Sequence, residues 1–163
     1  MATLKTYHPD YELFKDLQII CRDLYAGEAH VKSKGEIYLP CTSGMRIDGM
    51  GAGETGYLDY KAYVQRAVLP GDFEDAVNTR MGLLHQKPAV INLPASLEYL
   101  REDADGKGMP LEALLTLINL AQLMIGRIGL AVDATADRKL KLVVYDASSI
   151  MNWDNRDSGL QLV

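Results

Sequence analysis

The most apolar stretch of the chain, residues 111–125, has the pattern of a helix. Its polar side chains recur at steps of four, three and three, so they form one narrow stripe. They are Glu112, Thr116, Asn119 and Gln122. A helix that is apolar around the rest of its circumference must be covered there. Because such a helix is too short to cross a bilayer, the pattern predicts the centre of a soluble body.

Few other elements of so small a chain are available to cover this helix, which favours assembly with further subunits. We expect Leu117 and Ile118 to lie in a dry interior. An aspartate at either position would then unfold the domain, because an unpaired charge would be buried.

Helical periodicity also runs through the first two-thirds of the chain. The first helix is predicted over residues 9–25, since Pro9 suits a first helical position and Gly27 ends the element. Further helices are expected over about 28–34, 57–68, 73–85 and 94–100, with a short strand over 89–92.

After Gly126 the pattern changes to that of strands. Residues 128–132 and 139–145 are predicted as strands, and residues 148–153 as one helical turn. Residues 159–163 begin a further alternating strand, whose pairing partner we expect outside the given sequence. The predicted fold class is α+β, with a mostly helical N-terminal two-thirds and a small sheet after Gly126.

Length and composition suit a single domain over residues 1–163, because 48% of the 163 residues are hydrophobic and 24% are charged. Residues 41–56 contain a cluster of glycines and are predicted as a flexible loop. The spacing of Gly51, Gly53 and Gly56 matches a dinucleotide-binding loop. The preceding residues are too polar for the buried strand that such a loop requires, so we assign no cofactor-binding residue.

The net charge of −5, with lysines and arginines dispersed along the chain, argues against a surface that grips nucleic acid. The two cysteines, Cys21 and Cys41, form no disulfide framework. No apolar run reaches membrane-spanning length. These features together indicate a reducing cytoplasm.

The acidic segment Asp103-Ala-Asp105-Gly106 permits two functional interpretations. As a calcium loop it would use Asp103, Asp105 and Glu112, but it would place a cation, Arg101, on the first ligand position. As a phosphatase nucleophile loop it should follow a buried strand, whereas the preceding residues are helical in pattern. We favour a turn braced by aspartate side chains, with a metal-binding or phosphatase-like domain as an alternative.

Other candidate chemistry is sparse. The histidines, His8, His30 and His85, are not spaced as metal ligands, and no nucleophile, base and orienting group come together in the sequence. We therefore assign no catalytic, cofactor-binding or metal residue and do not expect an enzyme. A second alternative is a monomeric adaptor that binds a partner through Tyr57, Tyr60 and Tyr63.

Short motifs occur in a fixed order along nearly the whole chain. They are His8-Pro9-Asp10-Tyr11, Arg22-Asp23, Ala26-Gly27, Gly35-Glu36, Tyr38-Leu39-Pro40, Tyr60, Tyr63, Arg66-Ala67, Gly82, Lys87-Pro88, Asp103 to Gly108 leading into Leu111, Gly126-Arg127, Gly129-Leu130, Val132-Asp133, Ile150 and Asn152-Trp153. In this order and spacing the chain resembles the N-terminal wing region of a subgroup of tailed-bacteriophage portal proteins, the head-to-tail connectors. Portal chains are several times longer, and they have Phe at the position of His85.

The resemblance implies a structural subunit of the virion that assembles in the host cytoplasm. Portal subunits form a homo-oligomeric ring, typically a dodecamer, at one vertex of the phage head. The implied partners are the capsid protein, the terminase and a head–tail adaptor. DNA passes through such a ring during packaging and ejection without sequence-specific binding, and no membrane is involved.

Overall fold

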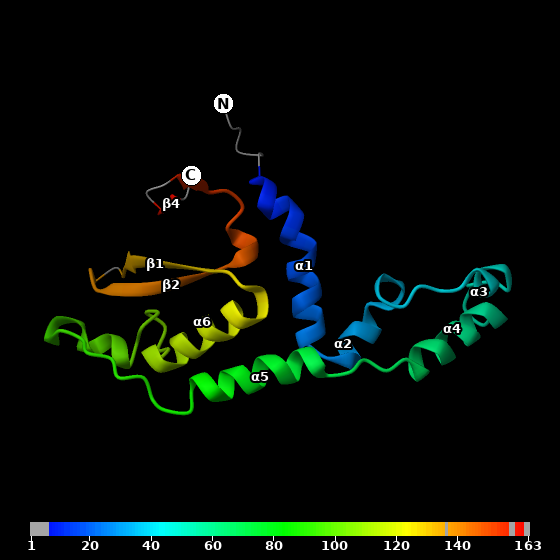
Figure 1. Cartoon of the computed structure of the whole chain (residues 1–163), viewed down its shortest axis with the longest axis horizontal. Coiled ribbons are helices and arrows are strands. Elements are labelled where there is room, and N and C mark those ends of the chain that lie inside the picture. Colours follow the sequence, from blue (N-terminus) through cyan, green and yellow to red (C-terminus); the bar gives the residue numbers. More distant parts are fainter. Residues whose placement is uncertain (1–6, 136, 157–158, 162–163) are drawn as a thin grey trace. The chain divides into compact units, whose positions relative to one another are not determined.

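The computed structural model describes residues 7–135, 137–156 and 159–161 (Figure 1). Contacts within the chain gather in two compact units: unit 1 comprises Met1–Cys21 with Val77–Val163, and unit 2 comprises Arg22–Ala76. We describe each unit by itself. The single domain expected over residues 1–163 stays a prediction.

Helices dominate the chain up to Ile125. The α-helices are α1 (Pro9–Tyr25), α2 (Glu28–Ser33), α3 (Ser43–Ile47), α4 (Thr55–Arg66), α5 (Asp72–Leu84) and α6 (Leu111–Ile125). Short 3-10 helices are η1 (Gly35–Ile37), η2 (Ala95–Arg101) and η3 (Ala147–Ser149). None of the helices in the described part of the chain combines the length and the apolar character that a membrane span needs.

The strands follow the helices, which confirms the α+β class. Strands β1 (Ile128–Ala134) and β2 (Leu140–Asp146) form an antiparallel hairpin in which Leu130 lies opposite Val144 and Val132 opposite Leu142. Strands β3 (Asp154–Arg156) and β4 (Gly159–Gln161) form a second antiparallel pair. The partner of the last strand is therefore inside the chain, contrary to our expectation.

The core of unit 1 lies between the start of α6, the hairpin and the turn before α6 (Figure 1). Its most buried members are Ala104, Leu111 and Leu114. The backbone of Ala104 joins these parts, because its N–H donates to the Met109 carbonyl and its carbonyl accepts from the Leu142 N–H, both at 2.7 Å. Ile91 packs against this core, but residues 89–92 form no strand, so that prediction is wrong.

A second buried group in unit 1 attaches the start of α1. The His8 N–H donates to the Met151 carbonyl at 3.0 Å, and the Tyr11 hydroxyl donates to the Ser148 carbonyl at 3.2 Å. The buried Trp153 ring stacks on the His8 imidazole, with 3.9 Å between the ring centroids. Contacts between segments this distant in sequence order the beginning of α1.

In unit 2, helix α3 interrupts the predicted glycine-rich loop over residues 41–56, so an irregular loop is the wrong description for residues 43–47. The helix begins where the Thr42 hydroxyl accepts a hydrogen bond from the Met45 N–H at 3.3 Å. Such a cap satisfies a backbone donor at the helix N-terminus. The start of α4 then packs against α3 at Gly56, where a side chain would collide with the carbonyl oxygens of Met45 and Gly49.

Substitution of Gly56 by alanine should therefore destabilise the protein by about 1–3 kcal/mol, because the added Cβ displaces backbone rather than a flexible side chain. Gly44 provides the matched control. A Cβ there meets only the Thr42 hydroxyl at 3.9 Å, an ordinary contact. Urea unfolding of Gly56→Ala and Gly44→Ala measures both effects, and equal midpoints for the two variants would contradict the packing of α3 on α4.

Candidate interaction surface

The predicted acidic turn of unit 1 binds its own backbone. The Asp105 Oδ1 accepts from the N–H groups of Lys107 and Met109 at 2.8 and 3.1 Å, and the Asp103 Oδ1 accepts from the Gly108 N–H at 2.8 Å. The bonds from Met109 and Lys107 lower the pKa of Asp105. The prediction that aspartates brace this turn is thus confirmed.

The metal-binding alternative finds little geometric support at this turn. Glu112 is an exposed residue in the first turn of α6. Across residues 7–135 and 137–153, no three His, Cys, Asp or Glu side chains are grouped so that they could hold a metal ion.

The glycine-rich segment of unit 2 also satisfies its own amide. The Gly51 N–H donates to the Glu54 Oε2 at 2.6 Å, so a carboxylate of the same segment occupies the donor that a bound phosphate would need. The segment follows α3 rather than a strand. Its geometry therefore differs from that of a dinucleotide-binding loop.

The three tyrosines of α4 do not form one exposed face. The Tyr60 hydroxyl is buried and has no hydrogen-bond partner among the described residues, and its burial raises the pKa of Tyr60. The Lys61 ammonium lies over the Tyr57 ring at 4.8 Å from the centroid. The adaptor alternative loses its central residue, because Tyr60 is directed into unit 2.

A polar cluster in unit 2, centred on Asp23, escaped the sequence analysis. The Asp23 side chain is buried and accepts from the Tyr38 hydroxyl at 2.5 Å, while its other oxygen contacts His30 Nε2 at 2.8 Å. The Lys34 ammonium lies 3.6 Å away. The Tyr38 hydrogen bond is the main reason that the pKa of Asp23 is lowered, and it helps raise the pKa of Tyr38 to about 12.

The Asp23 cluster joins three elements, since its members lie on α1, on α2 and directly after η1. The arrangement holds an aspartate ionised and a tyrosine protonated. Asp23 engages both the Tyr38 hydroxyl and the Lys34 ammonium, so we interpret the cluster as a brace of unit 2. Asp23 and Tyr38 both belong to the ordered motifs of the sequence, but nothing in the sequence shows that they lie together.

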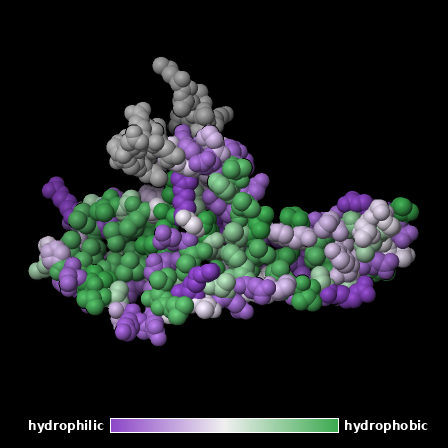
Figure 2. Space-filling model, viewed as in Figure 1, coloured by the Kyte–Doolittle hydropathy of each residue, from purple (hydrophilic) through white to green (hydrophobic). Residues whose placement is uncertain are grey.

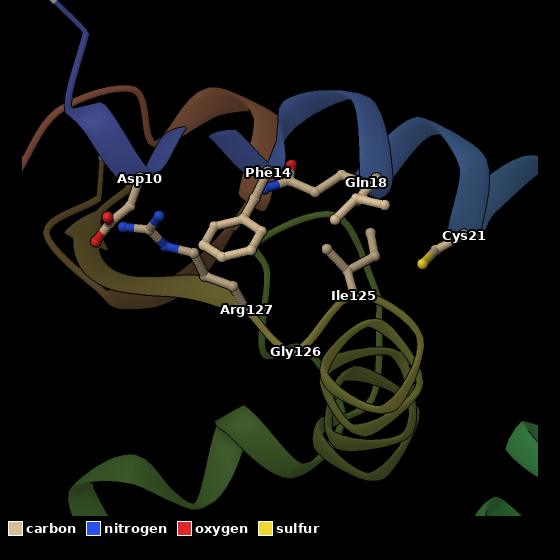
Figure 3. A pocket seen from close by; sticks show the side chains of 8 residues that line it. Asp10, Phe14, Gln18, Cys21, Ile125, Gly126 and Arg127 are labelled. Atoms are coloured by element: carbon tan, nitrogen blue, oxygen red, sulfur yellow. The ribbon is translucent and has the colours of Figure 1, made fainter. Parts of the chain in front are cut away.

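In unit 1, a cavity of about 310 Å³ lies between α1 and the end of α6 (Figure 3). Phe14 and Cys21 point from α1 toward Ile125, and Asp10 lies beside the Arg127 guanidinium. That guanidinium lies over the Trp153 ring at 3.5 Å from the centroid. Burial lowers the pKa of Arg127 and Asp10 acts in the opposite direction, so the cavity combines apolar walls with one partly desolvated cation.

The main candidate surface for contact with another protein is formed by exposed apolar side chains of α6 and the hairpin. Only Leu111 and Leu114 of α6 are buried, and Leu117 is 42% exposed. Leu130 and Val132 share the sheet face of Val144 and Leu142, which pack on the core, yet Val132 is 65% exposed. Hydrophobic residues accordingly gather over the hairpin in Figure 2.

The outer edge of β1 adds unpaired backbone to this surface. The Leu142 N–H donates outside the hairpin, to Ala104, so Val132 and Leu142 form a non-hydrogen-bonded pair. The backbone groups of Val132 therefore point away from β2. No described strand pairs with that edge. An apolar strand with a free edge is a site where another chain can dock.

Comparison with known proteins adds no identification. No model of a known protein family matches the chain, and no curated protein matches it.

The Asp23 cluster predicts a defined pH dependence of stability. Because its folded-state pKa lies below the ordinary value of 3.8, Asp23 stabilises the fold fully above that value. The contribution is lost as the pH falls through the lowered pKa. We expect Asp23→Asn to cost about 1–3 kcal/mol near neutral pH and progressively less below about pH 4.

Urea unfolding across this pH range measures the difference between the wild type and Asp23→Asn. The matched control is Asp59→Asn on α4, where the residue is exposed and has no ion pair within the described part of the chain. A cost for Asp23→Asn that does not change with pH would show that the carboxylate charge plays no role.

Proposed function

We propose that this protein is a structural subunit of a bacteriophage portal ring, the assembly at the head vertex through which DNA is packaged and ejected. The observation that carries the proposal is the uncovered apolar surface of α6 and β1. Leu117, Leu130 and Val132 expose between 42% and 65% of their surface although they adjoin the core. Contiguous apolar surface of this kind marks a protein contact.

Burial energetics favour self-association of this surface. Each apolar Å² removed from water contributes about 25 cal/mol, so several half-exposed leucines and valines can together stabilise a permanent interface. Obligate interfaces resemble a protein core that has been cut in two. The surface described above has that character, because the same helix and hairpin supply both the buried core and its exposed continuation.

The portal assignment rests on the motifs that resemble this family, and their placement supports a structural role. Three of these motif segments, containing His8, Arg127 and Trp153, meet in unit 1. His8 and Arg127 both stack on the Trp153 ring, and each lies within 4 Å of the centroid, at 3.9 and 3.5 Å. Ile150 packs over Gly129, where a Cβ would lie 2.8 Å from its Cδ1 atom. Residues that pack together in this way hold the backbone of unit 1 in place, which is a structural role.

The charge balance suits the same proposal. The net charge is −5, and an acidic subunit would repel DNA rather than hold it. The implied partners are further copies of the chain, the capsid protein, the terminase and a head–tail adaptor. In this role the chain needs no cofactor and performs no chemistry.

Two aspartate substitutions on α6 test the proposal. Leu114 is 3% exposed, so Leu114→Asp should unfold unit 1. Leu117 is 42% exposed, which corrects the prediction that it lies in a dry interior. Leu117→Asp should therefore leave the fold intact and abolish self-association, because a charge would enter the interface.

Circular dichroism measures folding, and light scattering with negative-stain electron microscopy measures assembly. The matched control is Thr116→Asp on the exposed polar stripe, which should change neither. We expect closed rings from the wild type. A wild-type chain that stays monomeric at every concentration would refute the proposal and favour the adaptor alternative.

A further inference from the structure

We propose that the exposed apolar stripe of α1 docks into the groove between α6 and β2 of a second copy of this chain. The inference rests on the proposed self-assembly and adds to it the two surfaces that meet. Both surfaces belong to unit 1. We call them the α1 stripe (Leu13, Asp16, Leu17 and Ile20) and the α6–β2 groove (Lys107, Leu114, Leu117, Lys141, Leu142 and Val144).

The α1 stripe is an apolar row on one side of a helix. Leu13, Leu17 and Ile20 follow one another at steps of four and three, which places them on one face. Leu13 is 67% exposed and Leu17 is 51% exposed. Phe14 and Cys21 point into the cavity beside α6 (Figure 3), and Leu17 also lines that cavity. The helix therefore presents, mainly at Leu13 and Ile20, apolar surface that its own unit leaves exposed.

The α6–β2 groove is a hollow of about 270 Å³ lined by apolar and basic side chains. Leu114, Leu117, Leu142 and Val144 supply apolar lining, and Lys107 and Lys141 supply two cations. Asp105 also lines the hollow, but its Oδ1 is engaged by two backbone N–H groups. The hollow can receive apolar side chains from a helix, a common mode of recognition.

Complementary charges on the stripe and the groove favour a second copy of this chain as the occupant of the groove. On α1, Glu12 is paired with Lys15 at 2.6 Å, whereas Asp16 has no ion pair with any described residue. At the groove, Lys141 contacts Asp133 at 3.3 Å, whereas Lys107 has no ion pair within the described ranges. One unpaired anion thus borders the stripe, and one unpaired cation borders the groove. Docking would bring Asp16 to Lys107 while the apolar side chains are buried.

The proposed contact joins two different surfaces, so it is head-to-tail. Each copy offers one stripe and one groove and can bind one neighbour on each side. Contacts of this type close into a ring when the rotation between neighbours permits. The contact is therefore of a kind that the proposed ring can use, and the number of subunits in the wild-type assembly distinguishes a ring from a reciprocal pair.

A mixing experiment with the full chain tests this directionality. Leu13→Asp disables the stripe and keeps the groove, whereas Leu117→Asp disables the groove and keeps the stripe. Each variant alone should be monomeric, with association weakened more than about a hundredfold by the buried charge. Mixed in equal amounts, the two variants retain one intact stripe and one intact groove per pair, so light scattering should detect a dimer and nothing larger.

Charge reversal supplies a second test that barely perturbs folding. Asp16→Lys and Lys107→Asp should each weaken association by roughly tenfold or more, because each places like charges together. The two changes combined in one chain should restore it. Arg80→Glu is the matched control, since this exposed cation lies on α5 outside both surfaces. Circular dichroism establishes that each variant is folded.

The outcomes separate this inference from the proposed function. A monomeric wild type would refute self-assembly itself. An oligomeric wild type whose assembly survives Leu13→Asp would keep the proposed function and refute the α1 stripe. Two variants that are each monomeric and form no dimer on mixing would refute the head-to-tail pairing. A dimer on mixing, together with rescue by the combined charge reversal, would establish it.

Discussion

The incomplete cover of α6 is the constraint on which the rest of the structure depends. The helix is apolar around most of its circumference, but the described chain buries it mainly at Leu111 and Leu114. Two hydrogen bonds at Ala104 hold the turn and β2 against that side. These hydrogen bonds satisfy the backbone groups of Ala104, so they fix the part of the chain that covers Leu111 and Leu114. Leu117 lies outside this cover. The free energy still available to α6 is that of burying Leu117 and the apolar surface next to it.

The positions of proline and glycine, together with hydrophobic periodicity, predicted the elements well where local signals were strong. Helix α1 begins at Pro9, and α6 ends where Gly126 adopts a left-handed φ of 83°, as the sequence indicated. Prediction failed where a tertiary contact decides. Residues 89–92 have the composition of a strand, but no strand among the described residues pairs with them, and the Ile91 carbonyl accepts from the Arg101 side chain. The Thr42 cap and the close packing at Gly56 make residues 43–47 helical despite the glycines.

Among the candidate sites, too, those formed by local contacts could be predicted from the sequence, whereas those formed by tertiary contacts could not. The Asp103–Asp105 turn could be predicted because aspartates bond to nearby backbone within a few residues. The Asp23 cluster could not, because its members become neighbours only after two elements have folded back. Periodicity predicts the helix over residues 9–25, but it could not assign Leu13 to solvent and Phe14 to a cavity. Helical patterns reveal apolar faces, whereas the neighbours determine which face is covered.

The distribution of satisfied and unsatisfied groups favours assembly over chemistry. An active site keeps polar groups poised toward a space that substrate enters. Here the notable carboxylates bind their own chain: Asp105 its turn, Glu54 the Gly51 amide and Asp23 a tyrosine and a histidine. The Tyr60 hydroxyl is buried in unit 2 and has no hydrogen-bond partner in the part of the chain that the structure describes. On the described surface, apolar side chains and the outer edge of β1 remain uncovered. Another protein chain would cover both, which is why we propose that this molecule is a building block.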